Sequence, residues 1–98
     1  METLDISKTD SDTGRRYSAR LYGYSEEAEL QLSRVSAAML IAAHTGVPED
    51  MAGLGVGRAL VERLVADARA EGFRIIPLCP FVKAQYQRHP EWADVING

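Results

Sequence analysis

Apolar and polar residues alternate along the stretch that begins at Arg15. In RRYSARLYG, Tyr17, Ala19 and Leu21 share one side, and polar residues occupy the positions between them. A period of two is typical of a half-buried strand, which Gly23 closes. Residues 1–14 carry few apolar side chains, and we expect them to form a flexible N-terminal segment ahead of a single domain over 15–98.

The next segment fits two periods. Alternate residues from Ala28 to Leu32 are apolar, as in a strand, yet apolar residues also recur every third or fourth position as far as Met39, as in a helix. Periodicity alone does not decide between them. Polar and apolar residues alternate before Ser36, whereas the residues after it are mostly apolar, which favours two strands joined by a turn. Pro48 ends the segment.

An amphipathic helix is predicted from Val56, with an apolar stripe that continues to Ala68 and charged residues opposite. Gly72 is placed to end this helix. The order of strand, glycine-rich turn, helix and strand is that of a βαβ unit, because an apolar run follows over residues 73–79.

The final part of the chain predicts an interrupted strand and a short helix. Pro77 lies within the apolar run and cannot donate a sheet hydrogen bond, so part of this strand should be unpaired. A second helix is expected from about Phe81 to His89, where Pro90 stops it.

Three glycines, Gly53, Gly55 and Gly57, precede the first helix at alternate positions. Glycine at a helix start costs about 0.5–1 kcal/mol relative to alanine, so the cluster needs a reason. One reason is a flexible turn. The other is an anion site, since the first N–H groups of a helix have no intrahelical acceptor and small residues let a phosphate approach them. The spacing matches neither a dinucleotide-binding fingerprint nor a phosphate-binding loop with lysine.

Composition narrows the classes of function. The 98 residues carry a net charge of −3, which argues against a nucleic-acid partner. No apolar run is long enough to span a membrane, and we expect a cytoplasmic protein. Cys79 is the only cysteine, which excludes an internal disulfide and a cysteine-cluster metal site.

Two runs, HTGVPEDMAGLGVGRALVERL and GFRIIPLCPFVKAQYQRHPEW, resemble the GNAT N-acetyltransferase superfamily, and in particular its small stand-alone members. The resemblance extends over about residues 15–95. It implies a minimal α/β GNAT fold: antiparallel strands, a βαβ unit with a glycine loop, and a short C-terminal helix. It also favours two strands for the ambiguous segment, and a gap between parallel strands near Pro77.

The resemblance implies a binding site for acetyl-CoA, or coenzyme A. Backbone amides of the glycine loop would hold the pyrophosphate, and the Val47 N–H would polarise the thioester carbonyl. The implied cofactor-binding residues are Val47, Gly53, Leu54, Gly55, Val56, Gly57 and Arg58. Lys83 could be a further cofactor-binding residue that meets the nucleotide phosphates, or an exposed solvated charge. Two positions depart from the family pattern: Ala52 replaces a common Arg or Gln, and Gly46 replaces a common acidic residue.

Three side chains are candidates for the chemistry. His44 could exchange a proton as a histidine imidazole, but it could equally be packed at a strand end. Cys79 could accept the acyl group if its thiolate is favoured by the following helix or by His44, could line the thioester channel, or could be an inert core residue. The resemblance gives Tyr86 the role of protonating the departing thiolate; core packing is the alternative.

The sequence therefore predicts an acetyl-CoA-dependent N-acetyltransferase that acts on a small-molecule or exposed protein amine. The alternative, favoured by Gly46 and Ala52, is a non-catalytic acyl-CoA-binding or interaction module that keeps the fold. We expect a monomer or a weak homodimer.

Overall fold

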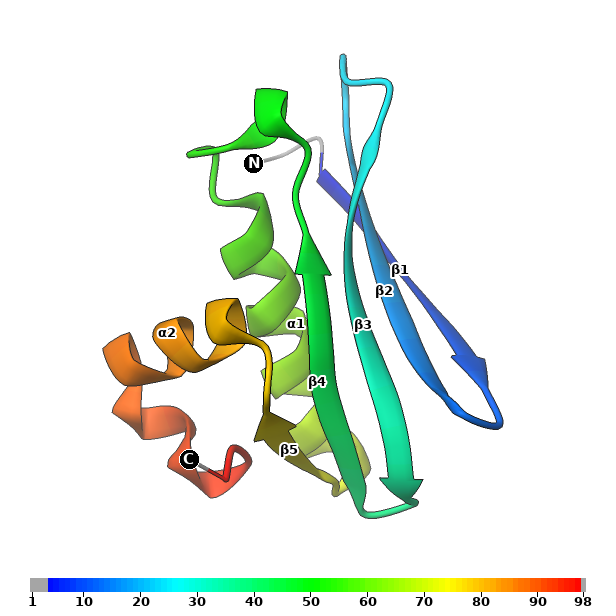
Figure 1. Cartoon of the computed structure of the whole chain (residues 1–98), viewed down its shortest axis with the longest axis vertical. Coiled ribbons are helices and arrows are strands. Elements are labelled where there is room, and N and C mark those ends of the chain that lie inside the picture. The colour runs from blue at the N-terminus through cyan, green and yellow to red at the C-terminus, as the bar shows by residue number, and fades with distance from the viewer. Residues whose placement is uncertain (1–3, 98) are drawn as a thin grey trace.

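The computed structural model describes residues 4–97, which form one sheet and two helices. The five strands lie in the order β1-β2-β3-β4-β5 (Figure 1). The strands are β1 (Leu4–Ser11), β2 (Gly14–Leu21), β3 (Glu27–Ser36), β4 (Met39–Gly46) and β5 (Arg74–Pro77). The helices are α1 (Val56–Glu71) and α2 (Pro80–Arg88), with short 3-10 turns η1 (Glu49–Met51) and η2 (Pro90–Asp94).

The predicted α/β arrangement is confirmed. Strands β1 to β4 pair antiparallel with their chain neighbours, and β4 and β5 are the parallel strands that α1 connects. The ambiguous segment forms the strands β3 and β4. Gly72 ends α1 in the left-handed conformation, with φ of 81°. The second helix, α2, spans Pro80–Arg88 and is followed by Pro90, as expected.

The prediction of a flexible segment over residues 1–14 is wrong for residues 4–11, which form β1. This strand pairs with β2 from Leu4↔Leu21 to Ser11↔Gly14. Leu4 and Ile6 pack against the core. The local pattern is too polar to predict a strand, and pairing with β2 supplies what the local sequence lacks. Residues 1–3 lie outside the described range.

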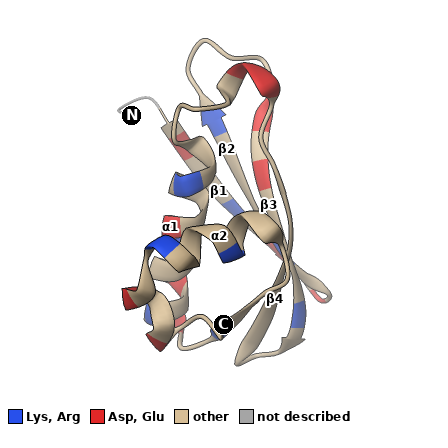
Figure 2. Ribbon diagram, turned by 60° about the vertical axis from the view of Figure 1, so that its left-hand side comes forward, with Lys and Arg blue, Asp and Glu red and all other residues tan. Residues whose placement is uncertain are grey.

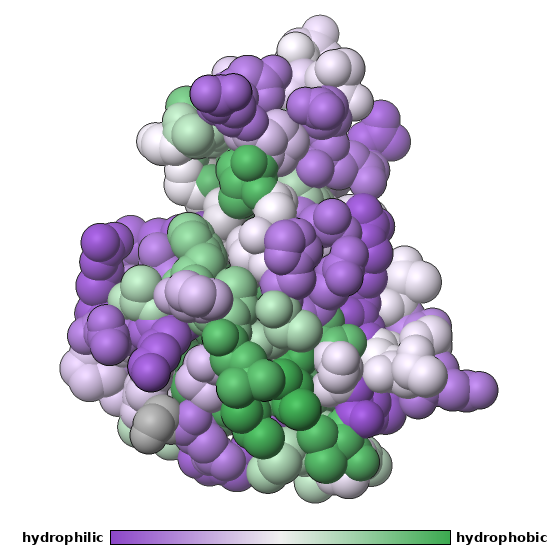
Figure 3. Space-filling view, viewed as in Figure 1, coloured by the Kyte–Doolittle hydropathy of each residue, from purple (hydrophilic) through white to green (hydrophobic). Residues whose placement is uncertain are grey.

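Alternate residues of the sheet face α1 and build the core. Tyr17 and Ala19 of β2 and Leu30 of β3 are fully buried there, and α1 contributes Leu60 and Leu64. We call this the inner face of the sheet. The opposite, outer face is polar over β1 to β3. Apolar surface gathers over the lower part of β4 and β5 (Figure 3), where the half-buried Ile41 and Ile76 are register partners.

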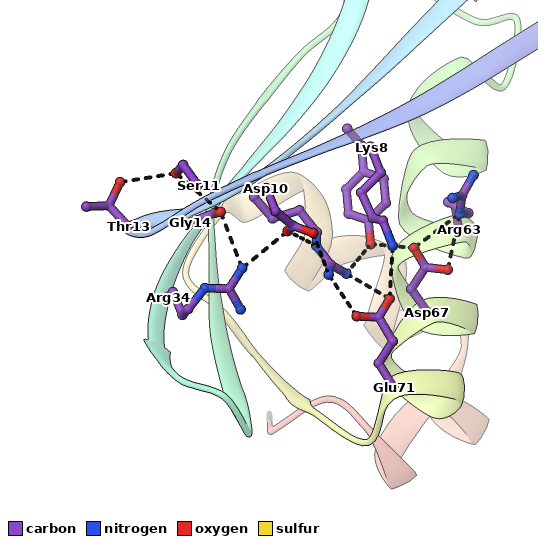
Figure 4. Close-up of polar contacts among 11 residues, drawn as sticks. Lys8, Asp10, Ser11, Thr13, Gly14, Arg34, Arg63, Asp67 and Glu71 are labelled. Carbon is purple, nitrogen blue, oxygen red and sulfur yellow. Dashed lines mark hydrogen bonds and ion pairs between the residues drawn. The ribbon is translucent and has the colours of Figure 1, made fainter.

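A polar network ties β1 and β2 to the C-terminal half of α1 on the inner face (Figure 4). The buried Arg15 donates to Glu71 at 2.7 Å and to Asp10 at 2.7 Å. The Tyr17 hydroxyl donates to Asp67 at 2.7 Å. Burial would lower the pKa of Arg15, but its two carboxylate partners raise it above the ordinary value. The network joins the hairpin of β1 and β2 to α1, which is distant from it in sequence.

The pairing of β4 with β5 covers only part of β4. The register runs from Met39↔Arg74 to Ala42↔Pro77, while β4 continues to Gly46 along β3. The last contact is the Cys79 N–H, which donates to the Ala42 carbonyl at 2.8 Å. Beyond Ala42, β4 therefore has a free edge, as Pro77 and the resemblance predicted. No helix within residues 4–97 is both long and apolar enough to cross a membrane.

A one-residue bulge precedes this free edge. Leu32 pairs with Ala42, whereas Gln31 pairs with His44, so Ala43 has no partner on β3. An extra residue reverses the alternation of faces beyond it. Thr45 is the partner of the buried Leu30 and lies on the inner face, whereas His44 is the partner of the exposed Gln31 and lies on the outer face.

Candidate functional site

A pocket of about 510 Å³ is lined by residues from the end of β4, the start of α1 and the first turns of α2. Figure 1 shows how these three elements are arranged. Thr45 and Val47 form the wall at β4, and Phe81 and Gln85 form the wall at α2. The remaining lining comes from the glycine loop and the first turn of α1, through Met51, Ala52, Gly53, Gly55, Val56, Gly57 and Arg58. The pocket opens on the inner face, next to the free edge of β4.

Glycine is required in this loop for two separate structural reasons. Gly53 and Gly55 adopt φ of 80° and 83°, a left-handed conformation that other residues adopt only with strain. Gly57 lies inside α1, and a Cβ there would be 2.6 Å from Cζ of Phe81 and 3.3 Å from Cγ2 of Val47. The third glycine therefore lets α1, α2 and the chain after β4 approach closely at the pocket.

The first turn of α1 presents backbone N–H groups to the pocket. Gly55 is the residue before the helix, and no side chain caps these groups. The amides of Val56, Gly57 and Arg58 have no acceptor within the helix. Unpaired amides and the positive end of the helix dipole together favour an anion at this wall. Arg58 adds the one formal positive charge among the lining residues.

The Val47 N–H is a further free donor. Val47 follows the last residue of β4 and lines the pocket. Within residues 4–97, its N–H makes no hydrogen bond to a backbone carbonyl. A free N–H at the wall of a pocket can polarise a carbonyl oxygen placed near it.

The Cys79 thiol lies behind Thr45. The distance between Sγ of Cys79 and Oγ1 of Thr45 is 3.2 Å, and Cys79 is only 5% exposed. Burial raises the pKa of this thiol. The Thr45 hydroxyl and the backbone N–H groups of Val82 and Phe81 outweigh burial, so the pKa lies below the ordinary value. Cys79 immediately precedes α2, which explains why those amides face it. The site therefore holds a thiol with increased thiolate character.

The expectation that His44 supports the Cys79 thiolate is wrong. The bulge at Ala43 places His44 on the outer face, where its side chain is exposed. Thr45 occupies the inner position instead and makes the contact to sulfur. The other expected support, the start of the second helix, is present. The structure thus separates His44 from Cys79 and joins Cys79 to Thr45.

Six of the eight expected cofactor-binding residues line the pocket, and Leu54 and Lys83 do not. Both of these side chains are exposed. Tyr86 also lies outside the lining, half-buried against the core. Sequence analysis missed Thr45 and Gln85. Gln85 could have been found, because it follows Phe81 by one helical turn and so lies on the same face of α2.

Comparisons with known proteins agree with this fold. Residues 16–95 match the GCN5-related N-acetyl-transferase family. The structure is similar to the NMR solution structure of a GCN5-like protein from Staphylococcus aureus, with a TM-score of 0.75 and 26% sequence identity. That similarity covers 100% of this chain and 92% of the other. No curated protein matches the sequence significantly. With a family match over most of its length and the same fold, the chain belongs to the GCN5-related N-acetyltransferases.

Proposed function

We propose that the protein transfers the acetyl group of acetyl-CoA to an amine, and that the pocket at the start of α1 binds this cofactor. The observation that carries the proposal is the convergence of free backbone donors on one 510 Å³ pocket beside the free edge of β4. Acetyl-CoA carries an activated acyl thioester and a pyrophosphate. A suitable site therefore needs backbone groups that bind an anion and a hydrogen-bond donor to the thioester carbonyl.

The residues present fit both needs. The amides of Val56, Gly57 and Arg58 would hold the pyrophosphate, because they have no acceptor within the helix and no side chain caps them. The Val47 N–H would polarise the carbonyl. The unpaired edge of β4 beyond Ala42 offers backbone groups to an extended chain such as pantetheine.

Thr45 and Cys79 supply the polar groups at the inner end of this pocket. Thr45 lines it, and Cys79 bonds to Thr45 from behind. This arrangement favours a role for Cys79 near the reacting carbonyl over an inert core position, since its thiol pKa is lowered despite burial. Tyr86 is the candidate proton donor to the departing thiolate, although it packs against the core and does not line the pocket.

The binding part of the proposal is tested with a matched pair of variants at Ala52. This residue lines the pocket, is exposed, and has an extended conformation that tolerates any side chain. Ala52→Glu adds a negative charge next to the pyrophosphate and should weaken CoA binding by about tenfold, whereas Ala52→Gln adds the same bulk without charge and should retain the affinity. Isothermal titration calorimetry with CoA measures both.

Equal CoA affinities for the two variants would place the pyrophosphate elsewhere. Failure of the parent protein to bind CoA would remove the proposal itself. Turnover is a separate measurement: release of free CoA thiol from acetyl-CoA in the presence of n-butylamine. Tight binding of CoA without turnover would indicate the acyl-CoA-binding module that the departures at Gly46 and Ala52 suggest.

A further inference from the structure

The outer face of the sheet carries a gap at Gly46. A Cβ built on Gly46 would lie 3.4 Å from Nε2 of His44, 3.6 Å from Cγ of Glu29 and 3.7 Å from Oε2 of Glu29. Two polar atoms from two strands therefore border one position that holds no side chain. We call this position the Gly46 gap. It exists because Gly46 lacks a side chain and is the register partner of Glu29.

The carboxylate of Glu29 is oriented with one oxygen facing this gap. Oε1 accepts hydrogen bonds from Gln31 at 2.8 Å and from Arg16 at 3.0 Å. Among residues 4–97, no side chain or backbone group donates to Oε2. The bonds from Gln31 and Arg16 hold the pKa of Glu29 below its ordinary value. Glu29 therefore presents a charged oxygen with free acceptor capacity.

The Gly46 gap and the pocket lie on opposite faces of the same short stretch of β4. Thr45 faces the pocket, Gly46 faces the gap, and Val47 follows directly. This stretch has no partner on β5, so the two faces meet at an open edge. A group in the Gly46 gap is thus next to the position proposed for the reacting carbonyl, without entering the cofactor pocket.

We propose that the Gly46 gap binds the ammonium group of the acetyl acceptor, and that the acceptor is a primary aliphatic amine. The inference rests on the proposed acetyl transfer. An ammonium has three donors, and Oε2 of Glu29 and Nε2 of His44 provide two acceptors for them. Acidic residues recur along β3 in this region (Figure 2), and arginines pair with them, but Oε2 of Glu29 keeps its acceptor capacity, which favours a cation over an anion at this point.

His44 can then take up the proton that acetyl transfer requires the amine to lose. One N–H bond of the ammonium breaks, and an Nε2–H bond forms on a neutral imidazole. The products are an amine with a free electron pair and an imidazolium beside the Glu29 carboxylate, which stabilises it. Glu29 in this scheme replaces, from β3, the acidic side chain that β4 lacks at position 46.

The test uses n-butylammonium as the probe and n-butanol as its uncharged counterpart. In a titration followed by ¹⁵N–¹H NMR, n-butylammonium should shift the amide signals of Gly46, His44 and Glu29 in a saturable way, and n-butanol should not. Glu29→Gln should weaken this binding by about tenfold or more, because it removes a charge-assisted hydrogen bond. Gly46→Ala should weaken it by filling the gap, without strain, since its added carbon makes only ordinary contacts.

Glu27→Gln is the matched control. Glu27 lies on the same face of β3, two residues away, and its partners are Arg16 and Arg20. This variant should bind n-butylammonium as the parent does. Equal effects of Glu29→Gln and Glu27→Gln, or shifts absent from Gly46 and His44, would overturn the inference. Binding of n-butylammonium in a protein that fails to bind CoA would support the Gly46 gap and refute the proposed acetyl transfer, so the two failures are distinguishable.

Discussion

Thr45 is the residue on which the chemistry of the Cys79 thiol depends most directly. Its hydroxyl is 3.2 Å from the sulfur and is the largest of the contributions that lower the thiol pKa. It also stands between Cys79 and the pocket, because Thr45 belongs to the lining and Cys79 does not. One side chain thus controls both the acidity of the thiol and its access.

Replacement of Thr45 by valine should raise the pKa of Cys79 and so leave less thiolate at pH 7. We expect the rate of alkylation by iodoacetamide at pH 7 to fall by about three- to tenfold, since one pKa unit is a factor of ten in thiolate. Rates measured from pH 6 to 10 by intact mass separate acidity from access. Thr9→Val, on the outer face of β1, is the control. An unchanged pH profile for Thr45→Val would show that the hydroxyl does not set the acidity.

Gly57 is the residue that makes the pocket wall possible. Gly57→Ala should improve helix propensity by up to about 1 kcal/mol, but its Cβ would overlap the Phe81 ring at 2.6 Å. We expect the ring to be pushed into the pocket and CoA affinity to fall by about tenfold, with a smaller loss of stability. Gly57→Ala combined with Phe81→Leu should recover the affinity in the same calorimetric titration. If Gly57→Ala alone binds CoA as the parent does, the added Cβ does not push the Phe81 ring into the pocket.

The candidate site could be predicted only where its residues follow local rules. The glycine loop signals itself by composition, and its position at the start of an amphipathic helix places it in the pocket correctly. His44 and Thr45 exchange faces because of one extra residue at Ala43, and nothing in the run MLIAAHTG distinguishes a bulged strand from a regular one. The contact between Cys79 and Thr45 depends on that bulge, because the bulge turns Thr45 to the inner face.

At the scale of elements, β1 illustrates why a strand can be invisible in the sequence. Its alternation is weak, and only Leu4 and Ile6 reach the core. The strand is held instead by pairing with β2 and by Asp10 and Lys8, which reach Arg15 and Glu71 respectively. The helices and the inner strands carry their own apolar patterns, so sequence analysis found them. A strand that is held by its partners on β2 and by Glu71, which is 63 residues from Lys8, leaves no such local signal.

The Arg15 network should make β1, β2 and α1 dependent on pH together. The pKa of Glu71 is lowered, first by its hydrogen bond from Arg15, so its contribution to stability is complete above the unfolded value of about 4.5 and is lost as the pH falls through the folded value. Glu71→Gln should reduce the free energy of unfolding at pH 7 by about 1–2 kcal/mol, because the buried Arg15 keeps one carboxylate of two.

Urea unfolding at pH 7 and at stepwise lower pH measures this contribution. The difference between the parent and Glu71→Gln should shrink below about pH 4. Glu62→Gln, on the same helix, removes only an exposed pair with Arg58 and should change stability by less than about 0.5 kcal/mol. A Glu71→Gln effect that stays constant down to acid pH would mean that the charge is not responsible.

At the scale of the whole molecule, an acidic protein carries the pocket for which we propose an anionic ligand. The start of α1 lies at the pocket, whereas the first N–H groups of α2 face the Cys79 thiol, and the net charge of the chain is −3. Only Arg58 among the lining residues carries a formal positive charge. Attraction for an anionic ligand must therefore come mainly from backbone dipoles at short range, which salt screens weakly compared with separated surface charges.

This predicts a CoA affinity with a shallow dependence on ionic strength. Between about 50 and about 500 mM NaCl, we expect the dissociation constant to rise by less than about tenfold, and Arg58→Ala to make the dependence shallower still. Calorimetric titrations at several salt concentrations provide the measurement. A hundredfold loss of affinity would instead assign the binding to exposed cations such as Lys83 and Arg88.

The order of the strands has a consequence for how quickly the chain can reach its native state. Each strand lies beside its neighbour in sequence, and three of the four pairings are hairpins. Loop closure between such neighbours costs little entropy, so the sheet can grow one hairpin at a time from either end. The parallel addition of β5 requires all of α1 to be traversed first. The pocket is lined in part by α2, which follows β5, and is therefore expected to be the final part of the molecule to assemble during folding.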